Sequence, residues 1–278
     1  MVKENLLKLD SNYHIIVNAT VASIYRKPDF SSELITQALI WEKLSVINKE
    51  NNWYKVKQRD GYEGWIHLFY IIDSSEYDNN KLLQDRKNWY WVRNKFLNLS
   101  LDNKQSFLIS YGSLIPCFED NNSFFTILPD SREPIKINRE SLISCTSKIA
   151  YKENIKNSVK ELIGLPYLWG GKSSFGFDCS GLLQSIINTS NFKFFQRDAS
   201  QQVLSDMLVQ KNNAPEVGNI IFFKMGEKVD HVGLYINDKE FIHSSGYVRI
   251  NSIDKENKYY SSKLEVNLYG LYEINIKS

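Results

Sequence analysis

The first part of the chain alternates short runs of β-forming residues with polar turns. Residues 12–75 contain TVASIYRKP, ELITQALIWEKLSVINKENNWYKVKQRDGYEGWIH and YIID, which are rich in β-branched and aromatic residues between Asn, Asp and Gly. Asp60 and Gly61 are a turn signal between NNWYKVK and YEGWIH. We therefore predict a small all-β barrel over residues 1–80.

A weaker copy of this pattern follows over residues 81–148. The segment SYGSLIPCFEDNNSFFTILPDSREPIKINRESLIS has three strand-like runs separated by EDNN and PDSREP turns, and it starts about 70 residues after its counterpart. A divergent internal repeat is the simplest interpretation. The sequence thus predicts a second small all-β barrel.

The periodicity changes after residue 148. SKIAYKENIKNSVKELIG places its apolar residues on one helical face: Ile155, Val159, Leu162 and Ile163. Gly164 and Pro166 end this helix, and a further helix is predicted over DASQQVLSDMLVQK. The strand-like runs GNIIFFK, HVGLYIND, EFIHSSG, YVRINSI and LYGLYEINI come last. Helices followed by antiparallel strands predict an α+β domain over residues 149–278.

Composition excludes several classes of protein. The 278 residues are 42% hydrophobic and 24% charged, with scattered charges that sum to +2, so nucleic acid and anionic membranes are not expected partners. No apolar run has the length of a membrane span. The N-terminus lacks the apolar segment of a secretory signal, so we expect a cytoplasmic protein, with an extracytoplasmic location left open if a signal was removed.

Three cysteines stand far apart without a CxxC pair, so neither a disulfide framework nor a structural zinc site is expected, and no cofactor is implied. Cys117 and Cys145 lie inside strand-like apolar runs and are predicted to be buried. Cys179 differs from them, because it stands in GGKSSFGFDCSGLLQSI, where a glycine-rich loop meets a helix.

The surroundings of Cys179 suit a nucleophile better than a buried hydrophobe. A helix that begins at this residue would bury one apolar stripe: Leu182, Leu183, Ile186 and Ile187. Asp178 is placed to act as the N-cap. The helix dipole would favour the thiolate, and the glycines would let a substrate backbone approach closely.

A thiol nucleophile needs a base, and the chain has four histidines. His14 and His67 belong to the first barrel, where surface or structural roles are expected. His231 and His243 lie 12 positions apart in DHVGLYINDKEFIHSSG, which has the pattern of one hairpin. A three-residue loop at 237–239 would pair His243 with Gly233 and bring both histidines to one face, roughly 7–8 Å apart. A two-residue turn would place them on opposite faces.

The segments LPYLWGGKSSFGFDCSG, DHVGLYI and FIHSSG resemble the signature segments of the NlpC/P60 family, papain-like cysteine peptidases of bacterial cell-wall peptides. The resemblance covers roughly residues 150–278. It implies a papain-like α+β catalytic domain in which Cys179 is the nucleophile, His231 the general base and His243 the residue that orients the base. It also implies that Tyr167 helps to hold the oxyanion, although a packing aromatic is the alternative.

The two barrels resemble bacterial SH3 (SH3b) domains. The first carries the NNWYKVK…DGYEGWI ending of that family, whereas the second has PIKI in place of the usual Gly-Trp. A barrel of this kind serves as a binding module or as a spacer, so it does not fix the function by itself.

The order of the domains is similar to that of γ-D-glutamyl-L-diamino acid peptidases, which trim murein peptides with a free N-terminal L-alanine. The resemblance implies that Tyr62 and Asp198 hold the α-ammonium of a murein-derived peptide, L-Ala-γ-D-Glu-diamino acid. Trp169, Ser200 and Asp178 are further candidates for substrate binding. The alternatives are a barrel aromatic for Tyr62 and a helix N-cap for Asp198.

Three other functions compete with this hypothesis. A cell-wall D,L-endopeptidase would act on intact peptidoglycan. A non-catalytic SH3b wall-binding protein would have no use for the Cys-His-His set. An acyltransferase with a related Cys-His core predicts a lipid-facing apolar segment, which the sequence lacks. The diamino acid that follows D-Glu is left open.

Overall fold

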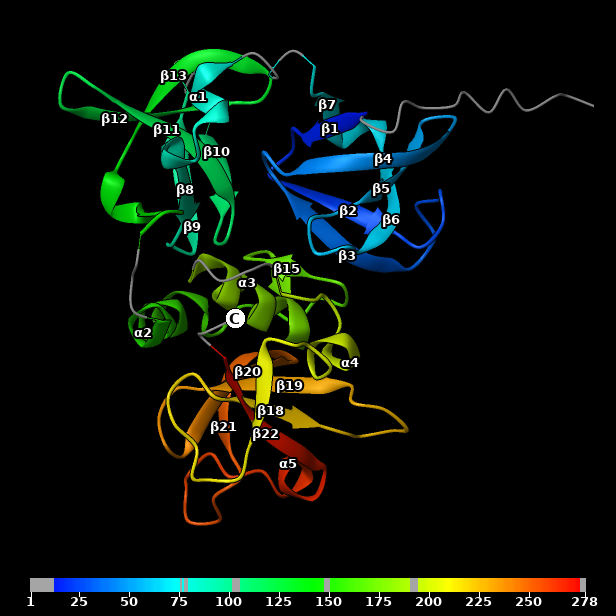
Figure 1. Cartoon of the computed structure of the whole chain (residues 1–278), viewed down its shortest axis with the longest axis vertical. Coiled ribbons are helices and arrows are strands. Elements are labelled where there is room, and N and C mark those ends of the chain that lie inside the picture. Colours follow the sequence, from blue (N-terminus) through cyan, green and yellow to red (C-terminus); the bar gives the residue numbers. More distant parts are fainter. Residues whose placement is uncertain are drawn as a thin grey trace, which may run out of the picture.

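The computed structural model describes residues 13–75, 77, 80–101, 106–147, 151–190 and 195–275. Figure 1 shows two β-rich lobes side by side, with a mixed α/β lobe beneath them. We call residues 13–75 the first lobe, the described residues of 77–147 the second lobe, and those of 151–275 the C-terminal lobe. No helix in these described ranges is both long enough and apolar enough to cross a membrane.

The first lobe is a seven-stranded sheet in the order β3-β2-β6-β5-β4-β1-β7. Its elements are β1 (His14–Val17), β2 (Val21–Tyr25), β3 (Leu34–Leu39), β4 (Lys43–Glu50), β5 (Trp53–Lys57), β6 (Glu63–His67), the 3₁₀ turn η1 (Leu68–Tyr70) and β7 (Ile71–Asp73). The predicted turn joins β5 to β6, with Gly61 at a φ of 86°, a left-handed conformation that glycine adopts without strain.

The second lobe holds a five-stranded sheet, β13-β12-β11-β8-β14, and the separate pair β10-β9. Its elements are α1 (Lys81–Gln84), η2 (Arg86–Asn88), β8 (Trp89–Val92), β9 (Phe96–Ser100), β10 (Ser106–Ser110), β11 (Leu114–Asp120), β12 (Ser123–Leu128), β13 (Ser131–Ile137), η3 (Arg139–Ser141) and β14 (Leu142–Ser144). Cys117 and Cys145 are buried, as predicted.

The C-terminal lobe packs helices against a six-stranded antiparallel sheet, β17-β22-β18-β19-β20-β21. Its elements are α2 (Tyr151–Leu162), β15 (Lys172–Ser173), β16 (Gly176–Phe177), α3 (Cys179–Thr189), α4 (Ala199–Gln202), β17 (Leu208–Lys211), β18 (Ile220–Phe223), β19 (His231–Tyr235), β20 (Glu240–Ser245), β21 (Tyr247–Ser252), α5 (Ser262–Val266) and β22 (Leu268–Ile274). The predicted α+β class is confirmed. The apolar stripe of α3 is buried in the main core between helices and sheet.

Two local predictions are wrong. Ile163 is 42% exposed, because α2 ends at Leu162 and Gly164 turns the chain at a φ of 84°. The helix expected over residues 198–211 is only the short α4. The last four residues of that range form β17, which pairs with the distant β22. A long-range strand pairing here overrides the local helical pattern.

The three lobes are joined by buried contacts. Hydrogen bonds that connect them include Trp41 Nε1 to Ile127 O (3.0 Å), Lys172 N to Gln37 Oε1 (2.9 Å) and Ser174 N to Ser110 Oγ (2.8 Å). The first of these joins the two β lobes, and the others join each β lobe to the loop that precedes α3. That loop is therefore held from both sides.

Candidate active site

Cys179 is the first residue of α3, and its neighbour Asp178 caps the helix. The Asp178 carboxylate accepts a hydrogen bond from Gly181 N at 2.6 Å, which satisfies one of the amides that a helix start leaves without a partner. Gly181 has to be glycine, because a Cβ there would lie 2.2 Å from the Gly171 carbonyl oxygen. The glycine-rich loop thus packs directly on the helix start that carries the thiol.

Arg197 fixes the Asp178 carboxylate from the other side. Its guanidinium is almost fully buried and donates from Nη2 and Nη1 to the two Asp178 oxygens at 2.6 and 3.0 Å. Nε donates to Thr36 Oγ1 of the first lobe at 2.9 Å. The Asp178 oxygens thus serve Arg197, Ser180 and Gly181, which gives Asp178 a structural role, and its substrate-binding role stays a prediction.

His231 and His243 face each other across the β19–β20 hairpin. The strands pair Leu234 with Ile242, and the register includes the three-residue loop at 237–239 on which the same-face arrangement of the two histidines depends. His231 Nε2 lies 2.7 Å from His243 Nδ1. The predicted hairpin geometry is confirmed. His14 and His67 lie on β1 and β6 of the first lobe and take no part in this pair.

Asn251, which the sequence reasoning missed, sets the protonation pattern of the pair. Its Nδ2 donates to the Tyr259 carbonyl at 2.9 Å, so its Oδ1 is the atom that faces His243 Nε2, also at 2.9 Å. His243 must then carry its proton on Nε2, and its Nδ1 accepts from His231 Nε2–H. The neutral His231 ring is left with an unprotonated Nδ1, the tautomer that a general base needs.

Burial keeps the resting site uncharged. It lowers the pKa of His231 to about 3, with His243, Lys263 and Arg249 adding to the effect. It lowers the pKa of His243 to about 4, although the Asn251 hydrogen bond opposes this shift. Two neutral imidazoles therefore share the site at neutral pH.

The thiol is also neutral at rest. Burial, followed by the charge of Asp178, raises the pKa of Cys179 to about 12. The expectation that the helix dipole would favour the thiolate is wrong, because loss of solvation outweighs it. Cys179 Sγ lies 3.8 Å from the Asp230 carbonyl, next to His231, and its hydrogen bond is directed there. If His231 is to accept the thiol proton, the Sγ–H has to turn from the Asp230 carbonyl towards the His231 ring.

Tyr62 and Asp198 come together from different lobes. The Tyr62 hydroxyl lies 3.1 Å from both Asp198 carboxylate oxygens, across 136 positions of sequence. Burial is the main cause that raises the pKa of Asp198, while Tyr62 and Arg197 oppose it. Asp198 also precedes α4 as its N-cap, where its backbone N–H donates to Gln201 Oε1 at 3.3 Å. The structure is thus compatible with both interpretations of Asp198: a carboxylate that binds substrate together with Tyr62, and the N-cap of α4.

Trp169 lies on the rim between the first and C-terminal lobes. It is 62% exposed, and its Nε1 donates to Glu33 Oε1 at 3.1 Å. Glu33 also forms an ion pair with Arg26 at 2.6 Å. Ser200 lies on α4, partly buried, and no printed contact among the described residues connects it to Asp198 or Trp169.

Tyr167 lies in the loop before β15 and is partly buried. Its backbone N–H donates to the Gly246 carbonyl at 3.0 Å, which ties the loop to the β20–β21 turn. Burial, followed by the proximity of Cys179 and Asp178, raises the pKa of its phenol to about 12. The hydroxyl is therefore a permanent proton donor near the thiol. No group of three or more His, Cys, Asp or Glu among the described residues is arranged to hold a metal ion.

Family comparisons agree with this geometry. Residues 164–267, which contain the cysteine and both histidines, match the NlpC/P60 family, and residues 24–68 match the bacterial dipeptidyl-peptidase SH3 domain. Residues 164–267 are an NlpC/P60 domain, and the protein is a cysteine peptidase. Its SH3 match spans the strands that carry Tyr62 towards Asp198.

Curated relatives of this NlpC/P60 peptidase include dipeptidyl-peptidases. A γ-D-glutamyl-L-lysine dipeptidyl-peptidase of Bacillus cereus is 29% identical over 77% of this chain and 68% of its own length. Dipeptidyl-peptidase 6 of Lysinibacillus sphaericus is 24% identical over 92% of this chain and 97% of its own length. The second of these similarities covers so much of the chain that it includes the first lobe as well as the catalytic domain.

Solved structures show the same fold. An NlpC/P60 family protein from Bacillus cereus has a TM-score of 0.77 and 22% identity, covering 93% of this chain and 98% of its own. An NlpC/P60 endopeptidase from Photobacterium damselae subsp. piscicida has a TM-score of 0.71 and 14% identity, covering 97% and 72%. The arrangement of all three lobes is therefore shared with other NlpC/P60 proteins.

Two residues of the candidate active site, Arg197 and Asn251, escaped the sequence reasoning. Arg197 had a signal, since it directly precedes Asp198 in QRDAS, but only the aspartate was assigned a role. Asn251 carried no usable signal in the sequence, because its hydrogen-bond partner His243 lies on a neighbouring strand, eight positions away. Strand register brings the two side chains together.

Proposed function

We propose that this peptidase hydrolyses the bond between γ-D-glutamyl and an L-diamino acid in murein peptides that begin with a free L-alanine. The names of the Bacillus cereus and Bacillus subtilis relatives support this substrate class. The observation that carries the proposal is the contact between the first-lobe hydroxyl of Tyr62 and the C-terminal-lobe carboxylate of Asp198. It places a partly buried negative charge where the two lobes meet.

The reaction begins when His231 Nδ1 accepts the proton of Cys179. The thiolate attacks the carbonyl carbon of the scissile bond, and the oxyanion accepts hydrogen bonds from the Cys179 backbone N–H and the Tyr167 hydroxyl. His231, now an imidazolium, gives its proton to the departing amine, and a thioester remains. Water, deprotonated by His231, then hydrolyses the thioester and returns the thiol.

His243 supports the proton transfer without a charge of its own. Its Nδ1 accepts from His231 Nε2–H throughout the cycle, so the His231 ring keeps its orientation when it becomes charged. Asn251 holds His243 in the tautomer that makes this acceptance available. These two residues therefore act as positioning residues.

The Tyr62–Asp198 pair defines the amino end of the substrate. Burial raises the pKa of the Asp198 carboxylate despite the opposing charge of Arg197, and the α-ammonium of L-alanine would favour its charged form. A substrate that continued beyond this amine, as a peptide on a glycan strand does, would run into the first lobe. Such geometry favours removal of a dipeptide from a free amino end.

The test compares L-Ala-γ-D-Glu-L-Lys and its diaminopimelate counterpart with free and acetylated amino ends, using mass spectrometry of the products. We expect acetylation to lower kcat/KM by at least ~10²-fold, because it removes the charge and leaves the Asp198 carboxylate unpaired. Asp198→Asn should raise KM for the free peptide. Cys179→Ala should abolish hydrolysis, whereas Cys117→Ala should not.

Tyr62→Phe has a matched control in Tyr54→Phe, a first-lobe tyrosine whose ring lies under Lys49 instead. The first variant should raise KM for the free peptide, and the second should not. Equal cleavage of free and acetylated peptides by the unaltered protein would refute a closed amino subsite. That result would favour a cell-wall endopeptidase.

A further inference from the structure

The turn that joins β10 to β11 of the second lobe packs into the C-terminal lobe. We call residues 110–113 the docking turn; it consists of Ser110, Tyr111, Gly112 and Ser113. Tyr111 is buried in the main core of the C-terminal lobe, not in the core of its own lobe. Ser110 and Ser113 are also fully buried. A segment of the second lobe thus completes the interior of the lobe that carries the thiol.

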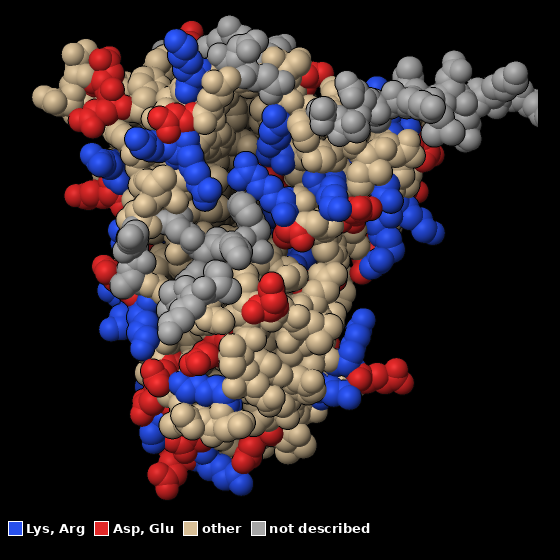
Figure 2. Space-filling view, viewed as in Figure 1, with Lys and Arg blue, Asp and Glu red and all other residues tan. Residues whose placement is uncertain are grey.

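The outer surface of the second lobe has no comparable feature on the face that Figure 2 shows. Acidic and basic side chains both occur over this face of the lobe, so no patch of one charge sign is present there for an anionic wall polymer. What distinguishes the second lobe is its contact with the C-terminal lobe.

The docking turn has a fixed shape within its own lobe. The Ser113 backbone N–H donates to the Ser110 carbonyl at 3.2 Å, which closes the turn, and Gly112 has a φ of 78°. The Tyr111 backbone N–H donates to the Lys95 carbonyl at 3.1 Å. The body of the second lobe therefore holds the turn in place.

The Tyr111 side chain anchors the turn to two helices of the C-terminal lobe. Its hydroxyl lies 2.7 Å from Ser158 Oγ of α2 and 2.9 Å from Thr189 Oγ1 of α3. Burial raises the pKa of this phenol, so it stays a neutral hydrogen-bonding group in the core. The Lys95 backbone N–H adds a hydrogen bond to Glu161 Oε2 of α2 at 2.6 Å. The second lobe is thus fixed to both helices.

The docking turn also holds the tip of the β15–β16 hairpin. The Ser174 backbone N–H donates to Ser110 Oγ at 2.8 Å, and the Tyr111 backbone N–H donates in return to Ser174 Oγ at 3.2 Å. Beside them, the Phe175 ring packs on Phe96 of β9, with ring centroids 5.1 Å apart. Both residues at the hairpin tip are therefore in contact with the second lobe.

The base of the same hairpin leads into the active site. Phe177 lies two residues before Cys179, and its carbonyl accepts from the Leu168 backbone N–H at 3.2 Å and from Ser244 Oγ at 2.7 Å. Ser244 is the neighbour of His243 on β20. The base of the hairpin thus connects three parts of the site: the nucleophile, the loop before β15 and the strand of the second histidine.

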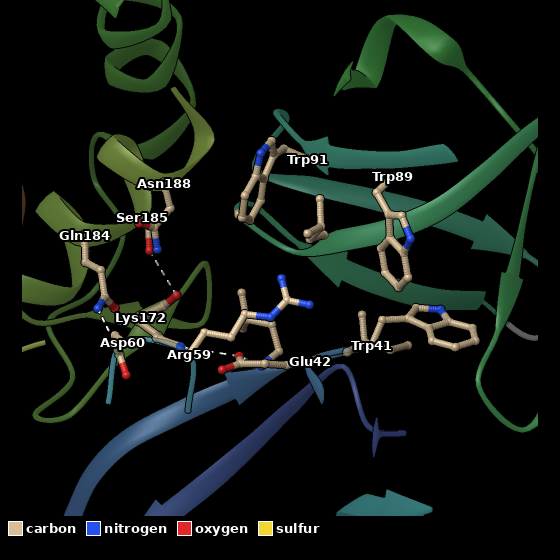
Figure 3. Close-up of a pocket in the computed structure, with 14 residues that line it drawn as sticks. Trp41, Glu42, Arg59, Asp60, Trp89, Trp91, Lys172, Gln184, Ser185 and Asn188 are labelled. Carbon is tan, nitrogen blue, oxygen red and sulfur yellow. Dashed lines mark hydrogen bonds and ion pairs between the residues drawn. The ribbon is translucent and has the colours of Figure 1, made fainter. Parts of the chain in front are cut away.

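The flank of α3 meets the hairpin and the docking turn at one place. In Figure 3 a dashed line joins Ser185 of α3 to Lys172 of β15, whose carbonyl accepts from the serine hydroxyl at 3.4 Å. Gly112 of the docking turn lies against the same serine, since a Cβ on Gly112 would be 3.7 Å from Ser185 Cβ. Helix, hairpin and docking turn therefore pack together.

We propose that the second lobe positions the nucleophile, with Ser110 as a positioning residue that acts through the β15–β16 hairpin. The hairpin has only two residue pairs, so a shift of Ser174 is passed to Phe177 and then to the Cys179 backbone N–H. That N–H donates to the oxyanion in the reaction described above, and a misplacement of about 1 Å at a reacting group can cost ~10²-fold in rate. A spacer or an independent wall-binding module would have no such effect.

The test removes the contact at the hairpin tip. Ser110→Ala takes away the acceptor for the Ser174 N–H and leaves the Tyr111 hydroxyl in place. We expect kcat for L-Ala-γ-D-Glu-L-Lys to fall roughly ten-fold with KM unchanged, because the change displaces the nucleophile and not the amino subsite. The Cys179 amide signal in the ¹H–¹⁵N NMR spectrum should shift as well. Ser174→Ala, which alters the same contact from the other side, should have effects in the same direction.

Thr126→Val is the matched control. It removes another fully buried hydroxyl of the second lobe, one that donates to the Pro116 carbonyl of that lobe at 2.8 Å. Urea unfolding measures the stability of each variant, and both Ser110→Ala and Thr126→Val should unfold at a lower urea concentration than the unaltered protein. Only Ser110→Ala should lower kcat and move the Cys179 amide signal.

An unchanged kcat in Ser110→Ala would overturn the proposal. Equal losses of kcat in Ser110→Ala and Thr126→Val would overturn it too, since both variants would then report stability alone. The choice of peptide rests on the proposed function. If the unaltered protein does not cleave this peptide, that function fails, and the NMR signal decides the positioning by itself: a Cys179 shift confined to Ser110→Ala supports it, and no shift refutes it.

Discussion

Replacing Arg197 by methionine should destabilise the protein by about 3–5 kcal/mol. The side chain is 1% exposed, and its loss would leave the Asp178 carboxylate, itself 11% exposed, without its buried counter-charge. Asp178 would keep the Ser180 hydroxyl and the Gly181 amide, which favours the lower end of that range. Since typical domains unfold at a cost of 5–15 kcal/mol, the effect is large enough to measure with certainty.

A double-variant cycle tests whether the pair acts as a unit. Asp178→Asn keeps an N-cap acceptor for Gly181 but leaves Arg197 as an unpaired buried cation, so it should also cost about 3–5 kcal/mol. The combined Arg197→Met and Asp178→Asn variant removes both charges. We expect it to lie within about 1–2 kcal/mol of the unaltered protein, far from the sum of about 6–10 kcal/mol that independent effects would give.

The assay is urea unfolding followed by both circular dichroism and tryptophan fluorescence, so that a transition of one lobe is distinguished from global unfolding. Lys152→Met is the control, because its ion pair with Glu216 is exposed and should contribute less than about 1 kcal/mol. A loss below about 1 kcal/mol in Arg197→Met, or additive losses in the cycle, would refute the view that this buried pair secures the helix start that carries Cys179.

Three further predictions concern the imidazoles and the thiol. Asn251→Ala should shift the ¹⁵N spectrum of His231 from one dominant tautomer to a mixture of tautomers. It should also lower kcat about two- to ten-fold, since a neutral hydrogen bond contributes about 0.5–1.5 kcal/mol. The control is Asn219→Ala, because Asn219 is buried and its Oδ1 accepts a hydrogen bond from Glu216 N. A single unchanged tautomer would contradict the assigned relay. Because the pKa of Cys179 is raised to about 12, the rate of its alkylation by iodoacetamide should rise steadily with pH, up to pH 9 and beyond. A rate that levels off near pH 6 would indicate a resting thiolate–imidazolium pair instead. The pKa values of His231 and His243 are lowered to about 3 and 4, so the unfolded chain, with histidine pKa near 6.5, binds more protons in acid. The free energy of unfolding should therefore fall as pH drops below about 6.5, by about 1.4 kcal/mol per pH unit for each histidine, and His243→Gln should remove one of these contributions.

Much of the catalytic core could be predicted from local sequence. The start of α3 at Cys179 follows from an N-cap aspartate before an apolar stripe, and the hairpin follows from two alternating runs around a short polar loop. Even the pairing of His231 with His243 could be predicted once the loop length was assumed, because strand side chains alternate strictly between faces. Each of these features depends on residues within about a dozen positions.

Local pattern failed where distant segments decide the structure. The segment that contains β17 has a helical pattern, yet its last four residues form a strand, because β22 offers them hydrogen-bonding partners 60–66 positions away. The thiolate expected from the helix dipole is absent for a related reason. The dipole is a property of α3 alone, whereas the burial of Cys179 comes from strands that pack over it.

The sequence by itself determined where the candidate groups stand: a cysteine at a helix start, two histidines in one hairpin, and the tyrosine and aspartate to which the family resemblance assigns an amine. Only the tertiary structure decided which of these side chains contact one another and which of them are charged. It brings Tyr62 to Asp198 across 136 positions, and it directs Asn251 at His243. It also encloses Arg197 between two lobes. Burial then fixes the charge of every group, since the cost of removing an ion from water depends on what surrounds it rather than on its neighbours in the chain.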